Sequence, residues 1–375
     1  MYEGKIVGLP VQTPWVDVRS IGAGGGSLAW VDVGGLLRVG PGSAGADPGP
    51  ACYDRGGTQP TVTDAAFLLG MLGEGNLASG IALNREAAQA AMAPLAEQLG
   101  FEVEEVARGI MTIAAANMAN AIREITVEQG QDPRTATLAP FGGAGPLFGT
   151  LLARELEIKR IVVPPYAGNF SAWGLLGADL TQSAARTRIT KLGDGVVDDA
   201  NAIVGTLFET LTARASAANG HGATTREVAA DMRYVGQEHT ITIPLRSEEG
   251  RVVADVDEIR QAFTQEYEKT FGHQMDEEVE IVSLRATLRT PLPRRAGEHV
   301  AASPDEAPLD AVSEAYSFTE QRWIPFRIVR RGQLEGSIAG PAIILEETAT
   351  TYLDSGFEAT VHDSGSLFVT DTRTA

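Results

Sequence analysis

Glycine is concentrated in one part of this chain of 375 residues, because twelve of its 42 glycines fall between Gly22 and Gly57. Glycine adopts left-handed backbone conformations freely and lets a ligand or another segment approach the backbone closely. The stretch PGSAGADPGPACYDRGG at residues 41–57 is too rich in glycine and proline for regular structure. A loop of this length inside a compact domain is usually functional, so we expect a site in this region.

The first glycine cluster reads GAGGGS at residues 22–27. We predict that it forms the turn of a β-hairpin between strands 16–21 and 28–33, followed by a second turn at Gly34-Gly35. The dinucleotide pattern G-x-G-x-x-G fails here, because Ser27 takes the place of the third glycine and a strand follows instead of a helix. The backbone amides of this turn can form an anion-binding nest, whereas the alternative is a tight turn that requires positive φ angles.

A second cluster, GGAGP at residues 142–146, lies between a predicted strand at 136–141 and a predicted helix at 147–156. A strand at 160–164 completes a β–turn–α–β unit. Helix N-termini present free N–H groups and the positive end of the helix dipole, so this turn is a second candidate for anion binding. A close-packed turn without a ligand is the alternative.

The rest of the chain predicts an α/β domain at 1–190, an α+β domain at 191–300 and a small β domain at 301–375. Apolar periodicity and terminal glycines predict helices at 85–99 and 103–128 in the first domain. Asp64 is expected to be the N-cap of a preceding helix. In the later part we predict helices at 198–219 and 256–271, strands within 227–245 and 278–290, a linker at 291–313 and short strands over 315–372.

Composition excludes several classes of function. The net charge of −19 argues against non-specific binding to nucleic acid or an anionic membrane. No apolar run reaches the ~18 residues of a membrane helix, and the polar N-terminus does not resemble a secretory signal. The single cysteine, Cys52, cannot form an intrachain disulfide, so we expect a cytoplasmic protein. The first of the five histidines is His221, which excludes Ser-His-Asp and His-rich zinc chemistry from the glycine-rich half.

The order glycine hairpin, helices, strand, GG turn and helix resembles the actin-like ATPase superfamily. Longer stretches resemble the hydantoinase A / 5-oxoprolinase family, and the resemblance runs from about residue 11 to the C-terminus. The stretches that carry it include SIGAGGGSLAWVDVGG, NMANAIREITVEQGQDPR, LAPFGGAGPLFG, YAGNFSAWGLLGADL and GPAIILEETATTYLDSGFEATVHDSGSLFV.

The resemblance implies an actin-like, ribonuclease H-type domain followed by an α+β region and a small C-terminal β domain. It implies ATP-dependent opening of a cyclic amide such as 5-oxoproline or a hydantoin, with ATP and nucleotide-bound Mg²⁺ as cofactors. In this chemistry the lactam carbonyl oxygen is phosphorylated, which makes the carbonyl carbon electrophilic. A site of glycine amides, carboxylates and Mg²⁺ suits phosphoryl transfer, which depends on positioning and charge neutralisation.

The family's functional positions can be carried over to this sequence. The phosphate-contacting residues would be Gly24, Gly25, Gly26 and Ser27, and the adenosine-side residues would be Gly142, Gly143 and Gly145. Asp47 and Asp64 match family signatures and are the candidate catalytic carboxylates, in contact with Mg²⁺-bound water. The alternatives are a role in loop structure for both and a helix cap for Asp64. Cys52 is expected to be a small buried hydrophobic residue.

The sequence departs from the family at three points. Phe148 stands where relatives usually carry a histidine, and Ser20 stands where actin-like ATPases carry an aspartate. The long N-terminal half of the family, with its first phosphate loop, does not precede the hairpin. The resemblance therefore implies three partners, namely a B-type subunit, a possible separate N-terminal half and a small-molecule substrate. A ketone carboxylase subunit and a non-catalytic fragment or assembly scaffold are the alternative functions.

Overall fold

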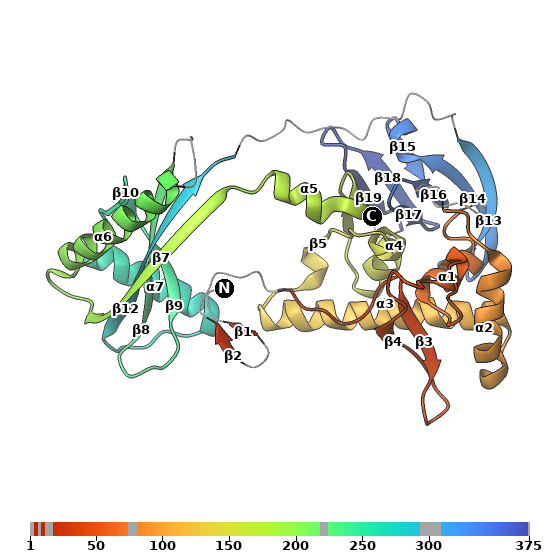
Figure 1. The fold of residues 1–375 in the computed structure, drawn as a ribbon, viewed down its shortest axis with the longest axis horizontal. Coiled ribbons are helices and arrows are strands. Elements are labelled where there is room, and N and C mark those ends of the chain that lie inside the picture. The colour runs from red at the N-terminus through yellow and green to blue at the C-terminus, as the bar shows by residue number, and fades with distance from the viewer. Residues whose placement is uncertain are drawn as a thin grey trace. The chain divides into compact units, whose positions relative to one another are not determined.

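The computed structural model of the chain describes residues 4–6, 9–11, 18–73, 81–217, 224–292 and 309–373. The chain divides into two compact units (Figure 1). Residues 18–175 and 295–375 form the unit that we call the glycine-rich unit, and residues 1–17 and 176–294 form the unit that we call the α+β unit. The two units are described separately, each with its own hydrophobic core.

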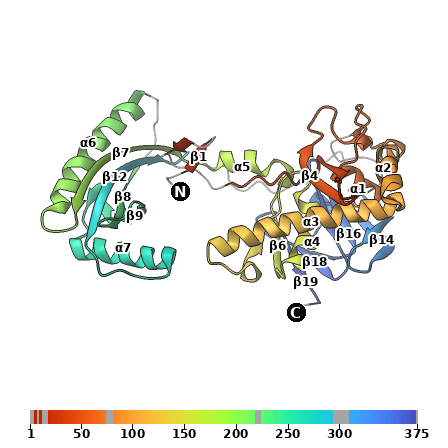
Figure 2. The same ribbon diagram turned by 90° about the horizontal axis from the view of Figure 1, so that it is seen from below.

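Helices make up one side of the glycine-rich unit. The long helix α3 (Val103–Glu128) packs against α1 (Val62–Leu68), α2 (Arg85–Leu99) and α4 (Gly145–Glu155), as both ribbon views show (Figures 1 and 2). The predicted helices 85–99 and 103–128 are confirmed, and Gly100 ends α2 in the left-handed conformation expected of a C-cap glycine. The shorter helices are α5 (Phe170–Leu176) and the 3₁₀ helices η1 (Ala51–Tyr53), η2 (Pro133–Thr135), η3 (Ala167–Asn169) and η4 (Arg331–Gln333).

Three sheets complete the glycine-rich unit. A five-stranded sheet has the order β15 (Ser337–Ala339), β18 (Phe357–Val361), β19 (Leu367–Asp371), β6 (Arg160–Val163) and β5 (Thr137–Leu138). A four-stranded sheet has the order β13 (Asp310–Ser317), β14 (Arg322–Arg330), β16 (Ala342–Leu345) and β17 (Thr350–Leu353). The third is the antiparallel hairpin of β3 (Ser27–Val31) and β4 (Leu37–Ser43).

The C-terminal strands share a sheet and a core with the first half of the chain. Strand β19 pairs antiparallel with β6. Strands β5 and β6, which precede and follow α4 in the sequence, pair in parallel, and this confirms the predicted β–turn–α–β unit. Phe148 of α4 and Tyr352 of β17 are fully buried in the same hydrophobic core. The limits of the compact units fall at 17/18, 175/176 and 294/295. The three-domain division at residues 190 and 300 stays a prediction.

The hairpin of the first glycine cluster differs from its prediction. No strand forms in residues 18–21, the described part of the predicted strand 16–21, and the hairpin is instead β3–β4. The second predicted turn, at Gly34-Gly35, is confirmed as the turn of this hairpin, where the Asp32 carboxylate accepts hydrogen bonds from Gly34 N and Leu36 N. The first cluster begins at Gly22, which has a φ of 63° and packs against Pro41 of β4. A Cβ atom at this position would collide with Pro41.

The α+β unit is built on one antiparallel sheet with the order β7 (Leu180–Lys191), β12 (Val279–Thr290), β8 (Thr225–Tyr234) and β9 (Ile241–Leu245). Helix α6 (Val196–Ala217) packs over β7 and β12, and α7 (Val256–Phe271) packs over β9. Alternate residues of β8 and β12 enter the core between the sheet and these helices. Two small hairpins complete the unit, formed by β1 (Gly4–Ile6) with β2 (Leu9–Val11) and β10 (Ser247–Glu248) with β11 (Arg251–Val252).

Most predicted elements of this unit are confirmed, and the helix at 256–271 has the predicted bounds. Strand β7 was not predicted. Residues 293–308 of the predicted linker, and His221 and His299, lie outside the described residues.

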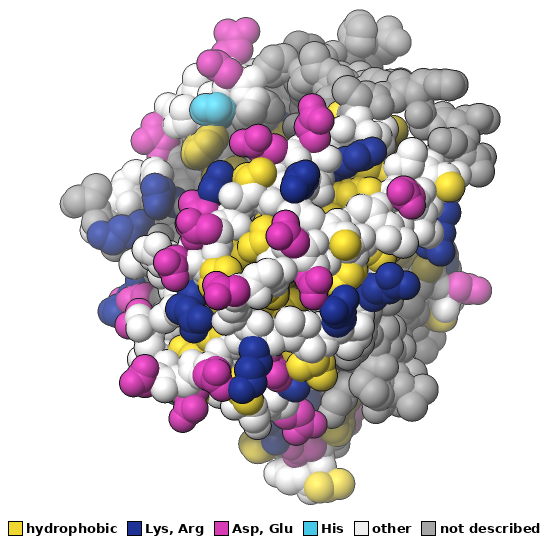
Figure 3. All heavy atoms as spheres, turned by 90° about the vertical axis from the view of Figure 1, so that its left-hand side faces the viewer, with side chains coloured by type: hydrophobic (Ala, Val, Ile, Leu, Met, Phe, Trp, Pro, Cys, Tyr) yellow, Lys and Arg dark blue, Asp and Glu magenta, His cyan; other side chains and the backbone are white. Residues whose placement is uncertain are grey.

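Figure 3 shows acidic and basic side chains intermixed on the face of the molecule that the α+β unit presents, with no continuous basic surface. Such a face offers no stripe of positive charge to a nucleic-acid backbone. Among the residues that the structure describes, no helix combines the length and the apolar character needed to span a bilayer.

Candidate functional site

The loop at residues 22–27 is held to the protein through its carbonyl groups. The carbonyl oxygen of Gly24 accepts from Ser27 N at 3.0 Å, that of Gly25 from Thr63 N at 2.8 Å, and that of Gly26 from Ala44 N at 2.9 Å. In a trans peptide the N–H group points away from the neighbouring C=O group. The N–H groups of Gly25 and Gly26 therefore point away from Ser27 and Thr63, the partners of the preceding carbonyls.

Ser27 has a structural role in this loop. Its side chain is buried. The hydroxyl accepts a hydrogen bond from Gly24 N at 2.9 Å and donates one to Gly22 O at 2.9 Å. These two bonds close the loop over the six-residue cluster. Both hydrogen bonds of the Ser27 hydroxyl are therefore made within the loop. A contact of Ser27 with phosphate stays a prediction.

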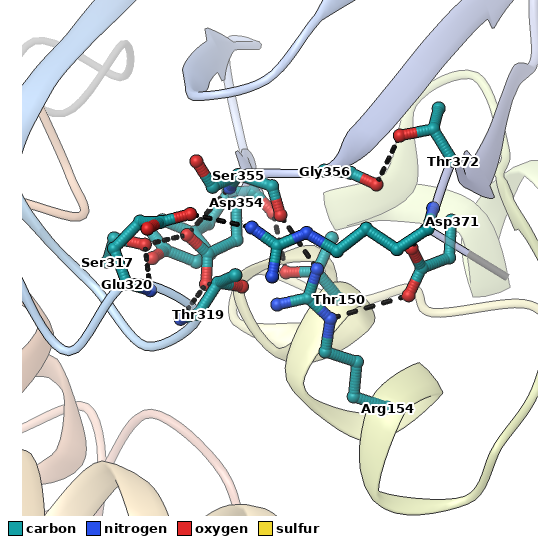
Figure 4. Close-up of polar contacts among 12 residues, drawn as sticks. Thr150, Arg154, Ser317, Thr319, Glu320, Asp354, Ser355, Gly356, Asp371 and Thr372 are labelled. Atoms are coloured by element: carbon teal, nitrogen blue, oxygen red, sulfur yellow. Dashed lines mark hydrogen bonds and ion pairs between the residues drawn. The ribbon is translucent and has the colours of Figure 1, made fainter.

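The second glycine turn leads directly into α4. Gly142, with φ of 86°, donates its N–H to Ala167 O at 2.7 Å, and the helix begins at Gly145. Helix α4 is also bonded to the C-terminal segment: Thr150, in the middle of the helix, donates to Tyr352 O at 3.2 Å, and Arg154, near its C-terminal end, donates to Ser355 O at 2.7 Å. Figure 4 shows Arg154 extending from the helix between Ser355 and Asp371. Contacts with the C-terminal segment therefore hold the middle and the C-terminal end of α4 in place.

The structure brings the two glycine clusters together, although they are more than a hundred residues apart in the sequence. A Cβ atom placed on Gly25 would lie 2.8 Å from Thr63 Oγ1 and 3.2 Å from Ala144 Cβ. Only glycine fits at this point without moving its neighbours. Gly24 and Gly145 lie on the same two turns as Gly25 and Ala144, so the predicted phosphate-side and adenosine-side residues face one region of the glycine-rich unit.

A cavity of about 270 Å³ lies between these turns. Its lining comes from the first glycine loop, the loop of 45–53 with Thr63 and Leu72, the second glycine turn and the segment 346–350. Of the predicted phosphate-side and adenosine-side residues, Gly25, Gly26 and Gly143 line it, whereas Gly24, Ser27, Gly142 and Gly145 are not among the described residues that do. The described residues that line it include backbone amides, hydroxyl groups and carboxylates, but no histidine. Small-molecule pockets usually have about 300–1,000 Å³, so the volume of this cavity lies just below that range.

The segment 346–350 was not assigned a role from the sequence, yet it forms one wall of the cavity. Glu346 N donates to Ala349 O at 2.9 Å, which closes a tight turn. Thr348 packs directly on Gly168, where a Cβ atom would collide with it. The stretch GPAIILEETATTYLDSG belongs to the resemblance quoted above, and this was the only signal in the sequence that pointed to it.

A buried ion pair fixes this wall. Arg331 bonds the Glu346 carboxylate and also donates to Val163 O at 2.8 Å, Pro164 O at 2.9 Å and Gly365 O at 2.7 Å. Both side chains are less than 5% exposed. Burial raises the pKa of the Glu346 carboxyl, and Arg331 opposes this shift. Because the pair ties the end of β6 to the start of the wall, we expect it to determine the shape of the cavity.

The two candidate catalytic carboxylates lie in different surroundings. Asp64 is fully buried and accepts hydrogen bonds from Cys52 N at 2.7 Å, Thr61 N at 2.9 Å, Thr61 Oγ1 at 2.7 Å and Ala51 N at 3.2 Å. The prediction that Asp64 is the N-cap of α1 is wrong. Thr61 takes that position, and Asp64 is the N3 residue of the resulting capping box. Its bonds favour the structural alternative.

Asp47 is exposed, and the described residues that line the cavity do not include it. Its neighbour in the loop, Gly45, does line the cavity. The described residues contain no cluster of three or more histidine, cysteine or acidic side chains arranged to hold a metal ion.

Comparisons with known proteins identify the family of the chain. Residues 1–184 match the hydantoinase/oxoprolinase model and residues 198–371 match the hydantoinase/oxoprolinase C-terminal domain model. The chain belongs to the hydantoinase/oxoprolinase family. An uncharacterized protein of Methanocaldococcus jannaschii is 36% identical over 98% of this chain and 53% of its own length. Caprolactamase subunit alpha of Pseudomonas jessenii is 32% identical over 96% of this chain and 53% of its own length.

The crystal structure of the ATP-dependent caprolactamase from Pseudomonas jessenii is similar to this structure. The TM-score is 0.77 at 30% identity, and the match covers 97% of this chain and 54% of that chain. This member of the hydantoinase/oxoprolinase family thus spans about half the length of the curated relatives that it matches. The mixed α/β fold with several sheets is shared with that relative.

One departure from the family now has a structural description. The Phe148 side chain, at the position where relatives usually carry histidine, is fully buried in the core of the glycine-rich unit. It is not among the described residues that line the cavity. Ser20, the other departure, is exposed and precedes the loop in a stretch without regular structure.

Proposed function

We propose that this chain is the nucleotide-binding part of an ATP-dependent cyclic-amide hydrolase, and that its cavity holds phosphates of ATP. The observation that carries the proposal is the meeting of the two glycine turns at Gly25 and Ala144, beside one cavity that both turns line. Turns of this kind bring backbone N–H groups to phosphate in many nucleotide sites. We also propose that the glycine-rich unit is an actin-like domain of ribonuclease H type.

The phosphate contacts follow from the orientation of the backbone. The carbonyl groups of Gly24 and Gly25 are bonded within the protein, so the N–H groups of Gly25 and Gly26 are oriented away from those partners. A Cβ atom on Gly24 would meet no atom within 4 Å, which leaves open space for a ligand at the backbone. The N-terminus of α4 at Gly145 supplies the positive end of a helix dipole on the other side.

The residues present fit ATP with a nucleotide-bound Mg²⁺ ion. Mg²⁺ usually keeps several water ligands and is held by phosphates with one or two carboxylates. The exposed carboxylate of Glu347 lines the cavity, and Asp47 lies on the loop whose Gly45 lines it. These two side chains would accept hydrogen bonds from metal-bound water, and Gly143 would approach the adenosine.

The reaction that we propose begins when the lactam carbonyl oxygen forms a bond to the γ-phosphorus and ADP leaves with the electrons of the broken P–O bond. Water then adds to the activated carbon, the C–N bond breaks as the nitrogen takes a proton, and a second water converts the acyl phosphate to acid and phosphate. The described residues that line the cavity supply no histidine for these steps. The protein's contribution is positioning and stabilisation of the phosphoryl charge by N–H groups.

The substrate class rests on relatives that are named for their lactams. Because this chain covers about half of the length of those relatives, we infer that activity requires further polypeptide, either a complementary N-terminal half or a B-type subunit. We further propose a cytoplasmic location. The domain limits at 190 and 300 belong to the same set of proposals.

ATP turnover by the full chain, in the complex that it forms in its source cells, tests this function. We expect caprolactam, 5-oxoproline or a hydantoin to raise ADP formation at least tenfold over the rate without lactam. ADP formation that requires a ketone and bicarbonate would instead establish the carboxylase alternative. Turnover that no lactam or ketone stimulates, in a complex shown to be intact, would support a scaffold role.

A further inference from the structure

Tyr53 is a polar side chain in the cavity that the proposed function does not use. It lines the cavity together with Gly25, Thr63 and Gly143. Its ring packs against the core of the glycine-rich unit, and the residue is half-buried. Leucine or phenylalanine could fill the same space in the core without a polar atom. The hydroxyl of Tyr53 therefore calls for a further explanation.

The hydroxyl end of Tyr53 lies beside the first glycine loop. The Thr63 hydroxyl lies near the Tyr53 hydroxyl, whose pKa it lowers against the effect of burial, and it donates to Gly25 O at 2.9 Å. The same Thr63 oxygen lies 2.8 Å from the Cβ position of Gly25. Tyr53, Thr63 and Gly25 therefore form a continuous polar edge of the cavity.

The backbone at Tyr53 is fixed from both sides. Asp64 holds Ala51 N and Cys52 N, and Asn84 N donates to Cys52 O at 2.8 Å. Tyr53 N donates to Pro50 O at 3.1 Å, within the 3₁₀ turn η1. A side chain on such a supported turn is held in place before a ligand arrives, which is what a binding residue requires.

Burial raises the pKa of the Tyr53 hydroxyl above its usual value, and the nearby Asp64 carboxylate acts in the same direction. The phenol therefore keeps its proton throughout the neutral range. A neutral O–H group in a partly desolvated position is a donor for an anionic oxygen and adds no charge to the site.

We infer that Tyr53 is a nucleotide-binding residue, whose hydroxyl donates a hydrogen bond to a phosphate oxygen held by the first glycine loop. This inference rests on the proposed function and adds a side-chain donor to the backbone donors of Gly25 and Gly26. The buried Asp64 then has the role of positioning Tyr53 through the turn η1. Loop 41–57 thereby becomes part of the phosphate site.

The test compares Mg·ADP binding to the full wild-type chain and to Tyr53→Phe by isothermal titration calorimetry. Phenylalanine keeps the ring, so we expect the unfolding midpoint without nucleotide to stay within about 2 °C, because one exposed-side hydroxyl contributes little to stability. We expect Kd to rise about tenfold, the loss of one hydrogen bond to a charged group. The control is Tyr267→Phe, which removes a hydroxyl bonded to Gln237 in the α+β unit and should leave Kd unchanged.

The outcomes separate this inference from the proposed function. Wild-type binding that Tyr53→Phe leaves unchanged would overturn the role of Tyr53 and keep the nucleotide site. Absence of wild-type binding would overturn both. If Tyr53→Phe fails to fold, the wild-type chain labelled with 3-fluorotyrosine provides the test. Added ADP is expected to shift the ¹⁹F resonance of Tyr53 more than that of Tyr267. Equal shifts would overturn the inference.

Discussion

Gly24 and Gly25 are neighbours in the sequence, but a methyl group would meet different surroundings at the two positions. At Gly25 it would meet Thr63 Oγ1 and Ala144 Cβ, whereas at Gly24 it would meet nothing within 4 Å. We expect Gly25→Ala to lower the free energy of unfolding by about 1–3 kcal/mol, as overpacking does in a tight site. Urea denaturation of both variants measures the difference.

The matched variant Gly24→Ala should unfold like the wild type. Gly24 directly precedes Gly25, whose N–H group we assign to phosphate, so the added methyl group should weaken Mg·ADP binding about tenfold. Equal stability losses for the two variants would contradict the contact between the glycine turns.

Asp64 provides a second test, because all of its hydrogen bonds are to donors. Asp64→Asn would turn an amide NH₂ toward the N–H groups of Cys52, Ala51 or Thr61 and leave at least one buried group unpaired. We expect a loss of about 2–4 kcal/mol in the free energy of unfolding. The control is Asp47→Asn, an exposed position, which should change stability by less than about 0.5 kcal/mol. A larger effect at Asp47 would reverse the roles that we assign.

Cys52 predicts a pH effect. Burial is the main cause that raises the pKa of its thiol far above the usual value, and the nearby Asp64 acts in the same direction. In the native protein the thiol should resist a disulfide reagent at pH 8, and it should react after unfolding in guanidinium chloride. Because the folded-state pKa is the higher one, the thiol contributes its stability below the unfolded pKa of about 8.5 and loses it as the pH rises beyond. Rapid labelling of native protein would contradict its burial.

At the scale of elements, the Arg331–Glu346 pair joins β6, the wall 346–350 and the turn at Gly365. Arg331→Met leaves a buried carboxylate without its partner, so we expect a loss of about 3–5 kcal/mol. Arg327→Met is the control, since Arg327 pairs with Asp310 on the surface and both side chains are more than half exposed. Its effect should stay below about 1 kcal/mol. Thermal unfolding of both variants decides, and similar losses would show that the buried pair has no special role.

The elements differ in how far the sequence predicts them. Helices α2, α3 and α7 were predicted because an apolar face repeats with helical spacing and glycine follows each C-terminus or lies one residue beyond it. Strand β7 was not predicted, since its sequence LTQSAARTRITK is polar and largely exposed at the edge of a sheet. A strand without a buried face shows no alternation of apolar and polar residues.

The candidate site was predicted in part. Both glycine clusters were identified from composition and resemblance, but their meeting depends on contacts between Gly25 and Ala144 that no local pattern reveals. Asp64 was predicted as an N-cap because the capping box with Thr61 was not recognised. The wall at 346–350 was missed because it contributes two acidic residues and a turn, which also occur on ordinary surfaces.

At the scale of the whole molecule, the chain joins a glycine-rich unit with a candidate nucleotide cavity to an α+β unit with its own core. The pairing of β19 with β6 joins the two sequence segments of the glycine-rich unit, and the paired strands lie about two hundred residues apart in the sequence. The family relatives are about twice as long as this chain. The central question is therefore whether this chain binds nucleotide by itself.

Calorimetric titration of Mg·ADP into the full chain answers that question directly. We predict a single binding event with Kd near the micromolar range, weakened by Gly24→Ala and by Tyr53→Phe but not by Tyr267→Phe. A chain that is folded by circular dichroism and binds no ADP at millimolar concentration would contradict the account, because the two glycine turns would then lack the nucleotide site that we assign to them.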